Sequence, residues 1–253
     1  MQLADKVAIV TGASSGIGRA AAKLFAAEGA RLIISARRAD ELNALAHEIS
    51  EAGGQAITLP GDIRNEALAK ELVQAALRRF GRLDIAFNNA GTLGEMGPTP
   101  NISAQGWRET MATNLDAAFF AAKHQVPAMI ENGGGSIVFV STFVGHATGM
   151  PGMAPYAASK AGLIGLARTL AVEFGANNIR VNALLPGGVD TPMGRAVADT
   201  DDKRDFIANL HALKRLAAPE EIARVALFLC SDAASFVTGS AMLVDGGVSI
   251  NKV

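Results

Sequence analysis

Residues 7–18 read Val-Ala-Ile-Val-Thr-Gly-Ala-Ser-Ser-Gly-Ile-Gly, and they carry the strongest indication of fold class in this chain. Its first four residues are apolar, which predicts a short strand that is buried on both faces of a parallel sheet. Gly12, Gly16 and Gly18 then predict a tight turn that opens a helix. Their spacing differs from the common Gly-x-Gly-x-x-Gly pattern, so the inference depends on the position of the turn between strand and helix. Such a turn presents backbone N–H groups to a pyrophosphate, which predicts a dinucleotide site.

The same alternation of strand and helix continues along the chain. Short β-branched runs alternate with longer segments that have apolar residues at helical spacing, which is typical of successive βαβ units. We therefore expect one Rossmann-like α/β domain over residues 1–253, with a doubly wound parallel sheet of about seven strands and helices on both faces. The expected strands are residues 7–10, 32–35, 56–59, 85–87, 137–140, 181–185 and 242–244, and the expected helices are residues 17–28, 39–52, 66–80, 103–130, 156–174 and 220–229.

Composition and charge exclude several classes of function. The chain has 23 Lys plus Arg against 24 Asp plus Glu, so no basic surface for nucleic acid is predicted. Polar residues interrupt the apolar runs long before the roughly 20 residues that span a bilayer, which predicts no membrane segment. The first residues lack a signal-peptide pattern and Cys230 is the single cysteine, so we expect a cytoplasmic protein. The four histidines are scattered, and no metal site is expected.

The second expected strand ends in the sequence Ser35-Ala36-Arg37-Arg38. An acidic residue at this point would bind the ribose 2′-hydroxyl of NAD, whereas a guanidinium pairs bidentately with the 2′-phosphate of NADP. Arg37 and Arg38 therefore favour NADP. NAD stays open as the alternative, because both side chains could instead be solvated charges at the start of the next helix.

Tyr156 and Lys160 stand four residues apart at the start of an expected helix, so their side chains project from one face. A phenol has a pKa near 10 and exchanges protons poorly at neutral pH unless a cation favours its phenolate. Lys160 supplies such a cation, which predicts proton transfer by Tyr156. From this spacing alone, the alternative remains that Tyr156 and Lys160 are ordinary surface residues at the start of a helix.

In combination, the motifs of this chain resemble those of the short-chain dehydrogenase/reductase family. The motifs that carry the resemblance are, in order, Thr11-Gly-x-x-x-Gly-x-Gly18, Asn88-Asn-Ala-Gly91, Asn114, Tyr156-x-x-x-Lys160, Pro186-Gly187 and Val244-Asp-Gly-Gly247, and they span essentially the whole chain. The resemblance implies that Tyr156 is the general acid or base at the substrate oxygen and that Lys160 lowers its pKa and binds the nicotinamide ribose. It also implies that Asn114 helps to hold a water beside the lysine. Because Asn is unfavourable inside a helix, we expect a local irregularity there.

The serine that the family places near its tyrosine has no direct counterpart here. In the family this serine is second in a Ser-Ser pair, about thirteen residues before the tyrosine, and Phe143 stands at that offset in this chain. Phenylalanine donates no hydrogen bond, so we infer a one-residue insertion within residues 146–155 and assign the role to Thr142. Ser141 is the alternative, and strand alternation sends the two side chains to opposite faces.

The resemblance also implies which residues bind the cofactor and what reaction follows. We expect an NADP-dependent oxidoreductase that transfers a hydride between nicotinamide and a ketone, aldehyde or secondary alcohol, as a carbonyl reductase or alcohol dehydrogenase does. A 3-oxoacyl-[acyl-carrier-protein] reductase and a non-catalytic NADP-binding regulator are the alternatives. Besides Tyr156 and Lys160, the residues expected to bind the cofactor are Gly12, Ser14, Ser15, Ile17, Gly18, Arg37, Arg38, Asp62, Ile63, Asn89, Ala90, Gly91, Pro186, Gly187, Val189 and Thr191.

Three segments flank the expected catalytic edge and are expected to set substrate specificity: residues 92–100, 145–155 and 193–210. Their methionines predict an adaptable, apolar substrate site. Members of the family are commonly tetramers, and the Ala-rich helices 103–130 and 156–174 would permit close packing of subunits. We therefore expect a homotetramer or homodimer.

Overall fold

The computed structural model describes residues 1–252 and contains a seven-stranded sheet in the order β3-β2-β1-β4-β5-β6-β7. Every neighbouring pair of strands is parallel, which confirms the predicted doubly wound α/β fold. The strand order reverses between β1 and β4, and ligands bind at such a reversal in α/β sheets. The strands are β1 (Val7–Thr11), β2 (Arg31–Ser35), β3 (Gln55–Thr58), β4 (Ile85–Asn88), β5 (Gly135–Val140), β6 (Ile179–Pro186) and β7 (Ala241–Val244).

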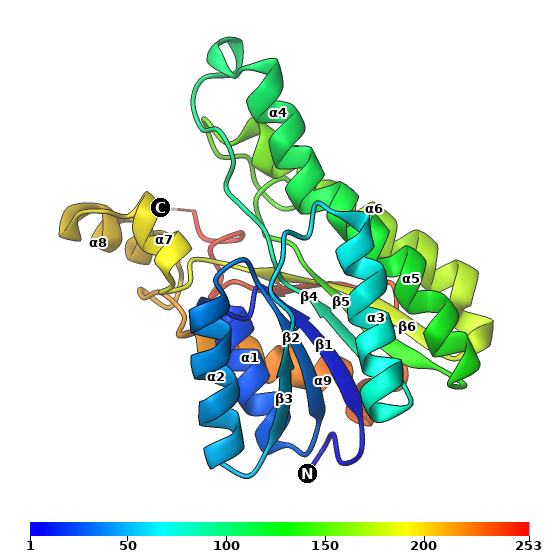
Figure 1. The fold of residues 1–253 in the computed structure, drawn as a ribbon. Helices are drawn as coiled ribbons and strands as arrows, with labels where there is room; N and C mark the ends of the chain where they lie inside the picture. The colour runs from blue at the N-terminus through cyan, green and yellow to red at the C-terminus, as the bar shows by residue number, and fades with distance from the viewer. Residues whose placement is uncertain (253) are drawn as a thin grey trace.

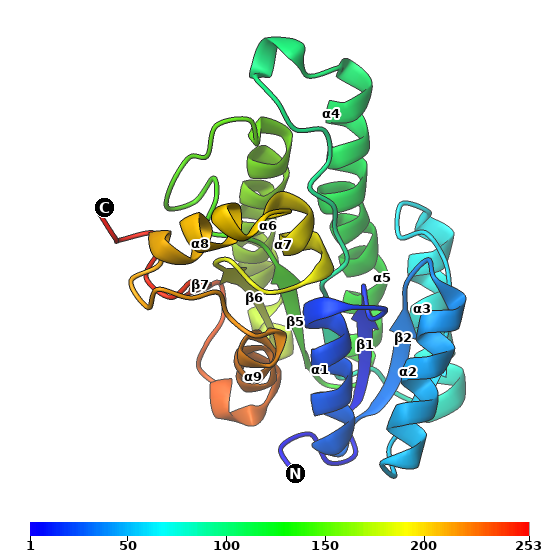
Figure 2. The same ribbon diagram turned by 90° about the vertical axis from the view of Figure 1, so that its left-hand side faces the viewer.

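Helices cover both faces of this sheet (Figure 1). One face is covered by α1 (Gly16–Ala27), α2 (Ala39–Glu51) and α9 (Pro219–Cys230). The other face is covered by α3 (Glu66–Phe80), α5 (Ala117–Glu131) and α6 (Ala154–Phe174). The remaining helices are α4 (Ala104–Met111), α7 (Pro192–Val197) and α8 (Asp201–Leu210), and they lie beyond the carboxyl ends of the strands (Figures 1 and 2).

Strand β1 shows why short apolar runs predicted buried strands. Ala8 and Val10 belong to the core on the α1 side of the sheet, whereas Val7 and Ile9 belong to the core on the α3 side. All four side chains are fully buried. Alternate residues of a strand point to opposite faces, so a strand with helices on both sides needs apolar residues at every position.

The predicted helix over residues 103–130 is continuous but irregular. After α4, residues Ala112–Asp116 form a π-helical turn, and α5 follows without a break. Asn114 lies in the middle of this turn, so the irregularity expected there is confirmed. Within the part of the chain that the structure describes, no helix is long and apolar enough to cross a membrane.

Periodicity did not predict helices α7 and α8, although Thr191 was a candidate helix cap and both helices fall in a segment that the sequence marks for specificity. Thr191 and Thr200 cap their N-termini through side-chain hydrogen bonds to backbone N–H groups. Neither helix contains a buried residue. Without a buried face, the sequence carries no periodic apolar pattern that would reveal them.

Candidate active site

The glycine-rich turn between β1 and α1 leaves no space for side chains. Gly12 has a φ of 67°, and a Cβ placed on it would lie 2.6 Å from Asn89 Nδ2. A Cβ on Gly18 would meet the carbonyl oxygen of Gly12. Ser15 precedes α1 but makes no capping hydrogen bond with its side chain, so it does not satisfy the leading N–H groups of the helix. The turn therefore fits a pyrophosphate held by backbone N–H groups.

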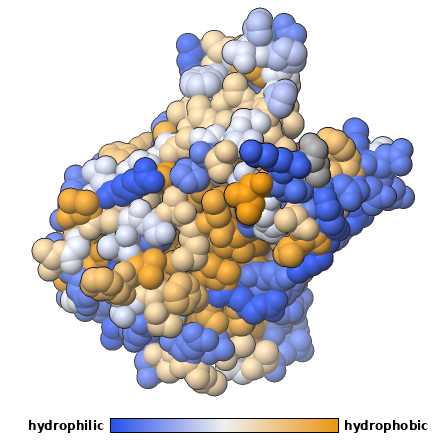
Figure 3. Space-filling view, turned by 180° about the vertical axis from the view of Figure 1, so that it is seen from behind, coloured by the Kyte–Doolittle hydropathy of each residue, from blue (hydrophilic) through white to orange (hydrophobic). Residues whose placement is uncertain are grey.

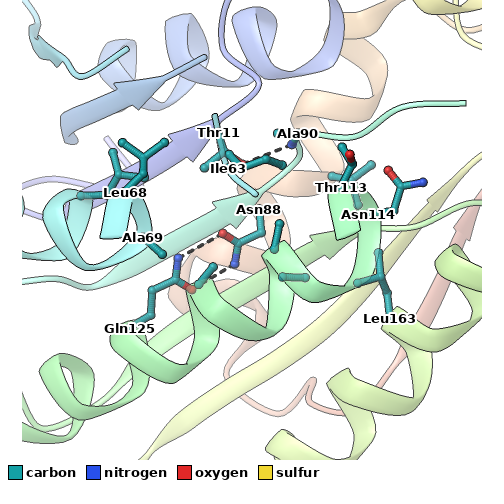
Figure 4. Close-up of a pocket in the computed structure, with 15 residues that line it drawn as sticks. Thr11, Ile63, Leu68, Ala69, Asn88, Ala90, Thr113, Asn114, Gln125 and Leu163 are labelled. Atoms are coloured by element: carbon teal, nitrogen blue, oxygen red, sulfur yellow. Dashed lines mark hydrogen bonds between the residues drawn. The ribbon is translucent and has the colours of Figure 1, made fainter. Parts of the chain in front are cut away.

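Thr11 and Asn89 join this turn to the end of β4. The Thr11 hydroxyl oxygen accepts hydrogen bonds from the backbone N–H groups of Asn89 (3.1 Å) and Ala90 (3.2 Å). The Asn89 amide donates in return to the Thr11 carbonyl oxygen at 3.0 Å. The neighbouring Asn88 exchanges two hydrogen bonds of 3.0 Å with Gln125 (Figure 4). The two asparagine side chains thus hold the scaffold of the site.

A cleft of about 1070 Å³ follows this edge of the sheet from Arg37 and Arg38 to Tyr156 and Lys160. Four expected cofactor residues do not line it within residues 1–252: Gly18, Pro186, Gly187 and Val189. Val189 is buried and pairs with Ala217, so this segment supports the wall of the cleft from behind. The expected residues that line the cleft are Gly12, Ser14, Ser15, Ile17, Arg37, Arg38, Asp62, Ile63, Asn89, Ala90, Gly91, Ser141, Tyr156, Lys160 and Thr191.

Arginine side chains surround one end of the cleft. Arg38 donates to the Ser14 hydroxyl at 3.0 Å. Arg64 pairs bidentately with Asp62, since its Nε donates to Oδ1 at 3.1 Å and its Nη2 donates to Oδ2 at 2.6 Å. The hydrogen bonds from Arg64, with a smaller contribution from the charge of Arg37, lower the pKa of Asp62. The carboxylate is thus engaged by Arg64, while the exposed Arg37 forms no ion pair with any described residue.

Thr142 and Ser141 have different hydrogen-bond partners at the end of β5. The Thr142 hydroxyl is close enough to the phenol to lower the pKa of Tyr156, and it accepts a hydrogen bond from the Val144 N–H at 3.3 Å. The Ser141 hydroxyl instead donates to the Lys160 carbonyl oxygen at 2.7 Å. Both side chains are buried, so neither hydroxyl is free to turn toward solvent. The effect on the phenol thus points to Thr142 as the hydroxyl that acts beside Tyr156, whereas among the described residues Ser141 lines the cleft and Thr142 does not.

Burial dominates the proton affinities of the two central residues. It raises the pKa of Tyr156, and the hydrogen bond with Thr142 offsets this effect only in part. Lys160 is buried and donates to the Val140 carbonyl oxygen at 2.7 Å, and desolvation lowers its pKa to about 8. In the protein without a nucleotide, burial therefore outweighs the groups that lower the pKa of Tyr156, and the lowering expected from Lys160 stays a prediction for the protein with its cofactor bound. The phenol stays protonated at neutral pH and has a proton to donate.

Tyr156 is the only tyrosine of the chain, so the ultraviolet absorbance of phenolate reports on this residue alone. Because burial raises its pKa, we expect phenolate to form only above the ordinary tyrosine pKa of about 10 in a titration of the nucleotide-free protein. Thr142→Val should raise the pKa further, because the hydrogen bond from Thr142 lowers it. Tyr156→Phe should show no transition, and a transition near neutral pH in the wild type would contradict this description of the site.

Asn114 holds the segment after β4 against α6. Its Oδ1 accepts from the Thr92 N–H (2.8 Å), and its Nδ2 donates to the Thr92 carbonyl oxygen (2.9 Å) and the Ser159 hydroxyl (3.0 Å). A Cβ on Gly91 would lie 3.0 Å from Asn114 Oδ1 and 3.1 Å from Lys160 Nζ, so glycine fits best between these two side chains. A cavity of about 30 Å³ adjoins Asn114 (Figure 4), and this volume suffices for one water.

Several groups of the site were not expected from the sequence. The carbonyl oxygen of Val140 and the backbone of Thr92 act through main-chain atoms, which every residue type carries. Arg64 follows Asp62 by two residues, and this spacing was the one available signal of their ion pair. The Thr11 hydroxyl lies directly before Gly12, and its role depends on β4, which is distant in the sequence.

Comparison with known proteins identifies the family. A family model described as "Enoyl-(Acyl carrier protein) reductase" matches residues 12–249. The chain belongs to the short-chain dehydrogenase/reductase family. Cyclohexanol dehydrogenase from Acinetobacter sp. is 38% identical to this chain over 96% of its length and 94% of that protein. The 3-oxoacyl-[acyl-carrier-protein] reductase from Thermotoga maritima is 38% identical over 99% of this chain and 100% of that protein.

Solved structures of this short-chain dehydrogenase/reductase family share the fold. One of them is a proposed NAD(P)-dependent gluconate 5-dehydrogenase from Beutenbergia cavernae, and its crystal structure contains NADP at low occupancy. It superposes with a TM-score of 0.93 and 37% identity over 99% of this chain and 99% of that chain. The present protein is accordingly an oxidoreductase, which favours an enzyme over the non-catalytic regulator considered above.

Proposed function

We propose that this short-chain dehydrogenase/reductase reduces an apolar ketone or aldehyde with NADPH and oxidises the corresponding alcohol in the reverse direction. The observation that carries the proposal is the single cleft that joins the arginine-rich end to Tyr156 and Lys160. One end of the cleft has the charge to bind a phosphate, and the other end has a protonated phenol to supply a proton.

The residues present fit a dinucleotide phosphate. The free N–H groups at the start of α1 and the space kept open by Gly12 suit the pyrophosphate. Arg37 and Arg38 would hold the 2′-phosphate, since no acidic residue follows β2 directly to accept a ribose hydroxyl and Asp62 is already paired with Arg64. Gly91 and Thr191 would line the opposite end of the bound molecule.

The side chains at that end suit the reduction of a carbonyl group. A bound nicotinamide dinucleotide supplies the hydride for the carbonyl carbon. Tyr156 donates its phenolic proton to the carbonyl oxygen, and the Thr142 hydroxyl donates a hydrogen bond to the same oxygen as negative charge develops on it. Lys160 has a pKa of about 8 and is charged at neutral pH, so its ammonium stabilises the phenolate that remains on Tyr156.

The surroundings of Tyr156 favour an apolar substrate. Phe143, Val144 and Met153 form a buried apolar cluster, and Met150 and Tyr156 pack against it. Two of the three specificity segments expected from the sequence contribute to this cluster and its surroundings. Of these residues only Tyr156 lines the described cleft, and Met193 adds an apolar side chain to its lining. A hydrocarbon ring is compatible with these surroundings, and cyclohexanol dehydrogenase is one of the relatives.

The decisive experiment measures NADPH and NADH oxidation with cyclic ketones, linear aldehydes and a 3-oxoacyl thioester. We expect turnover with NADPH and an apolar ketone. Replacement of Arg37 by Ala should raise KM for NADPH by about tenfold or more, because a charged hydrogen bond to the 2′-phosphate is lost, and leave KM for NADH nearly unchanged.

Arg79→Ala is the matched control, since Arg79 is also an exposed arginine but lies in the last turn of α3, outside the cleft. An equal response of the NADPH and NADH constants to Arg37→Ala would refute the NADP assignment and leave the chemistry intact. Preference for the 3-oxoacyl thioester would favour the acyl-carrier alternative. No turnover with any carbonyl compound would refute the proposed reaction.

We also propose that four copies of the chain assemble, because apolar side chains remain exposed on two sides. Val172 is exposed on α6, although other residues of that helix, such as Leu163 and Ile164, are buried against the sheet. A helix with apolar residues on all sides is normally covered on all sides. Phe236 and Ile250 are exposed near the C-terminal end, and apolar side chains gather on the face shown in Figure 3.

Sedimentation analysis of the wild type and a Val172→Glu variant tests this assembly. We expect a tetramer for the wild type and a smaller species for the variant, because a glutamate buried in the contact loses its hydration without gaining a partner. Lys203→Ala on the exposed surface of α8 serves as the control and should leave the mass unchanged. A monomeric wild type would refute the proposed assembly.

A further inference from the structure

His211 is a buried histidine that belongs to neither the glycine-rich turn nor the catalytic pair. It follows the last residue of α8 and is 2% exposed. Its Nε2 lies 2.9 Å from the backbone nitrogen of Gly188, and its Nδ1 lies 2.8 Å from the carbonyl oxygen of Ile207. A peptide N–H only donates and a carbonyl only accepts, so these partners require a neutral ring with its proton on Nδ1 and an acceptor at Nε2.

Two glycines lie close to the ring of His211. A Cβ on Gly188 would lie 2.8 Å from His211 Cε1, and a Cβ on Gly246 would lie 3.3 Å from His211 Cδ2. The imidazole therefore fills the space between the segment after β6, the segment after β7 and the last turn of α8. A side chain at Gly188 would clash with the ring, and Gly246 has a φ of 57° that favours glycine, so the backbone passes close to the ring at both positions.

The segment that His211 holds continues directly into the wall of the cleft. Three residues after Gly188, Thr191 lines the cleft, and a Cβ on Gly16 would lie 3.0 Å from its Cγ2. The other side of the segment is held by Ala217, whose N–H donates to the Gly188 carbonyl oxygen at 2.9 Å. The position of Thr191 against the glycine-rich turn thus depends on a backbone anchored at Gly188.

We infer that His211 is a positioning residue. Its Nε2 accepts a hydrogen bond from the Gly188 N–H and so connects the last turn of α8 to the wall that carries Thr191. This connection shapes the nicotinamide end of the cleft. The inference rests on the proposed nucleotide-binding function. His211 does not touch the reacting atoms, and its effect passes through the backbone of residues 188–191. Loss of this hydrogen bond therefore lowers the affinity for ligands that reach this wall and leaves unchanged the affinity for ligands that occupy only the arginine-rich end.

Two polar variants separate the two hydrogen bonds of the ring. In His211→Asn, the side-chain amide reaches the position of Nδ1 and retains a donor for Ile207, but it is too short to accept from Gly188. In His211→Gln, the longer side chain places an amide oxygen near the position of Nε2 and retains that acceptor. The variants are compared by calorimetric titration with NADPH, which would span the cleft, and with 2′,5′-ADP, which carries the adenosine half with its 2′- and 5′-phosphates and lacks the nicotinamide half.

We expect His211→Asn to weaken NADPH binding by about tenfold and His211→Gln by less than about threefold, because a buried donor is left unpaired only in the first. Both variants should bind 2′,5′-ADP as the wild type does. Equal loss of affinity for both ligands in His211→Asn would overturn the inference, because it would indicate a general loosening of the fold. A glutamine variant as weak as the asparagine variant would also overturn it.

A second measurement uses the wild type alone and does not depend on the folding of a variant. Amide hydrogen exchange over residues 186–192 should show Gly188 protected in the nucleotide-free protein, and rapid exchange at that amide would overturn the inference. Failure of the wild type to bind both NADPH and 2′,5′-ADP would instead refute the proposed function, on which the inference rests. The two failures are therefore distinguishable.

Discussion

Replacement of Tyr156 by Phe is expected to lower kcat for carbonyl reduction by about 1,000-fold, because a positioned general acid contributes a factor of this order. The substitution removes one hydroxyl and leaves the ring in its apolar surroundings beside Phe143 and Met153. NADPH affinity should therefore stay close to that of the wild type. The measurements are kcat from NADPH oxidation and the dissociation constant of NADPH from its fluorescence.

The combination of the two measurements makes this test specific. A large fall in kcat together with an equal fall in affinity would indicate a disturbed cleft and not a lost acid. A fall in kcat of less than about tenfold would mean that the proton reaches the substrate oxygen from another group, and the mechanism proposed for Tyr156 would be wrong. Thermal unfolding of the variant provides the control for folding.

Replacement of Thr142 by Val should lower kcat by about 100-fold, since it removes a hydrogen bond to an oxygen on which charge develops. Valine has nearly the same shape as threonine, so the change removes the hydroxyl and little else. The matched variant is Ser141→Ala at the adjacent position, whose hydroxyl is engaged by the Lys160 carbonyl oxygen. We expect Ser141→Ala to retain kcat within about threefold, because its hydroxyl already donates to the Lys160 carbonyl oxygen.

Steady-state assays of both variants under the same conditions decide between the two hydroxyls. Thr142→Ser should recover most of the activity that Thr142→Val loses, since it restores a donor at the same position. If Ser141→Ala were the more damaging change, the assignment from the structure would be reversed, and Ser141 would take the role that we give to Thr142.

The strands and the first turn of this protein were predictable because they depend on local sequence. β1 and β5 are apolar at nearly every position, since helices cover both faces of the sheet. The glycines at positions 12 and 16 have positive φ values, which other residues rarely adopt. By contrast, α7 and α8 were not predicted, because helices without a buried face leave no apolar period in the sequence.

The candidate site likewise contains residues that the local sequence indicates and partners that only the tertiary structure shows. Tyr156 and Lys160 were recognisable because four residues of a helix bring them to one face, and Asn114 revealed its π-helical turn because Asn is unfavourable inside a regular helix. Asn88 and Asn89 were recognisable as a turn, but their side chains hold Gln125 and Thr11, and such partners lie on other elements. Backbone partners such as the Val140 carbonyl oxygen cannot be inferred from residue types, because every residue carries a backbone carbonyl.

The doubly wound sheet, the phosphate-binding turn and the Tyr156–Lys160 pair could all be inferred from the sequence, because periodicity and short spacings specify them within one or two neighbouring elements. Three features required the packed structure: the choice of Thr142 over Ser141, the upward direction of the Tyr156 pKa, and the bond between His211 and Gly188. Each of these depends on burial and on the meeting of groups far apart in the chain, and both arise only when the helices and strands pack together.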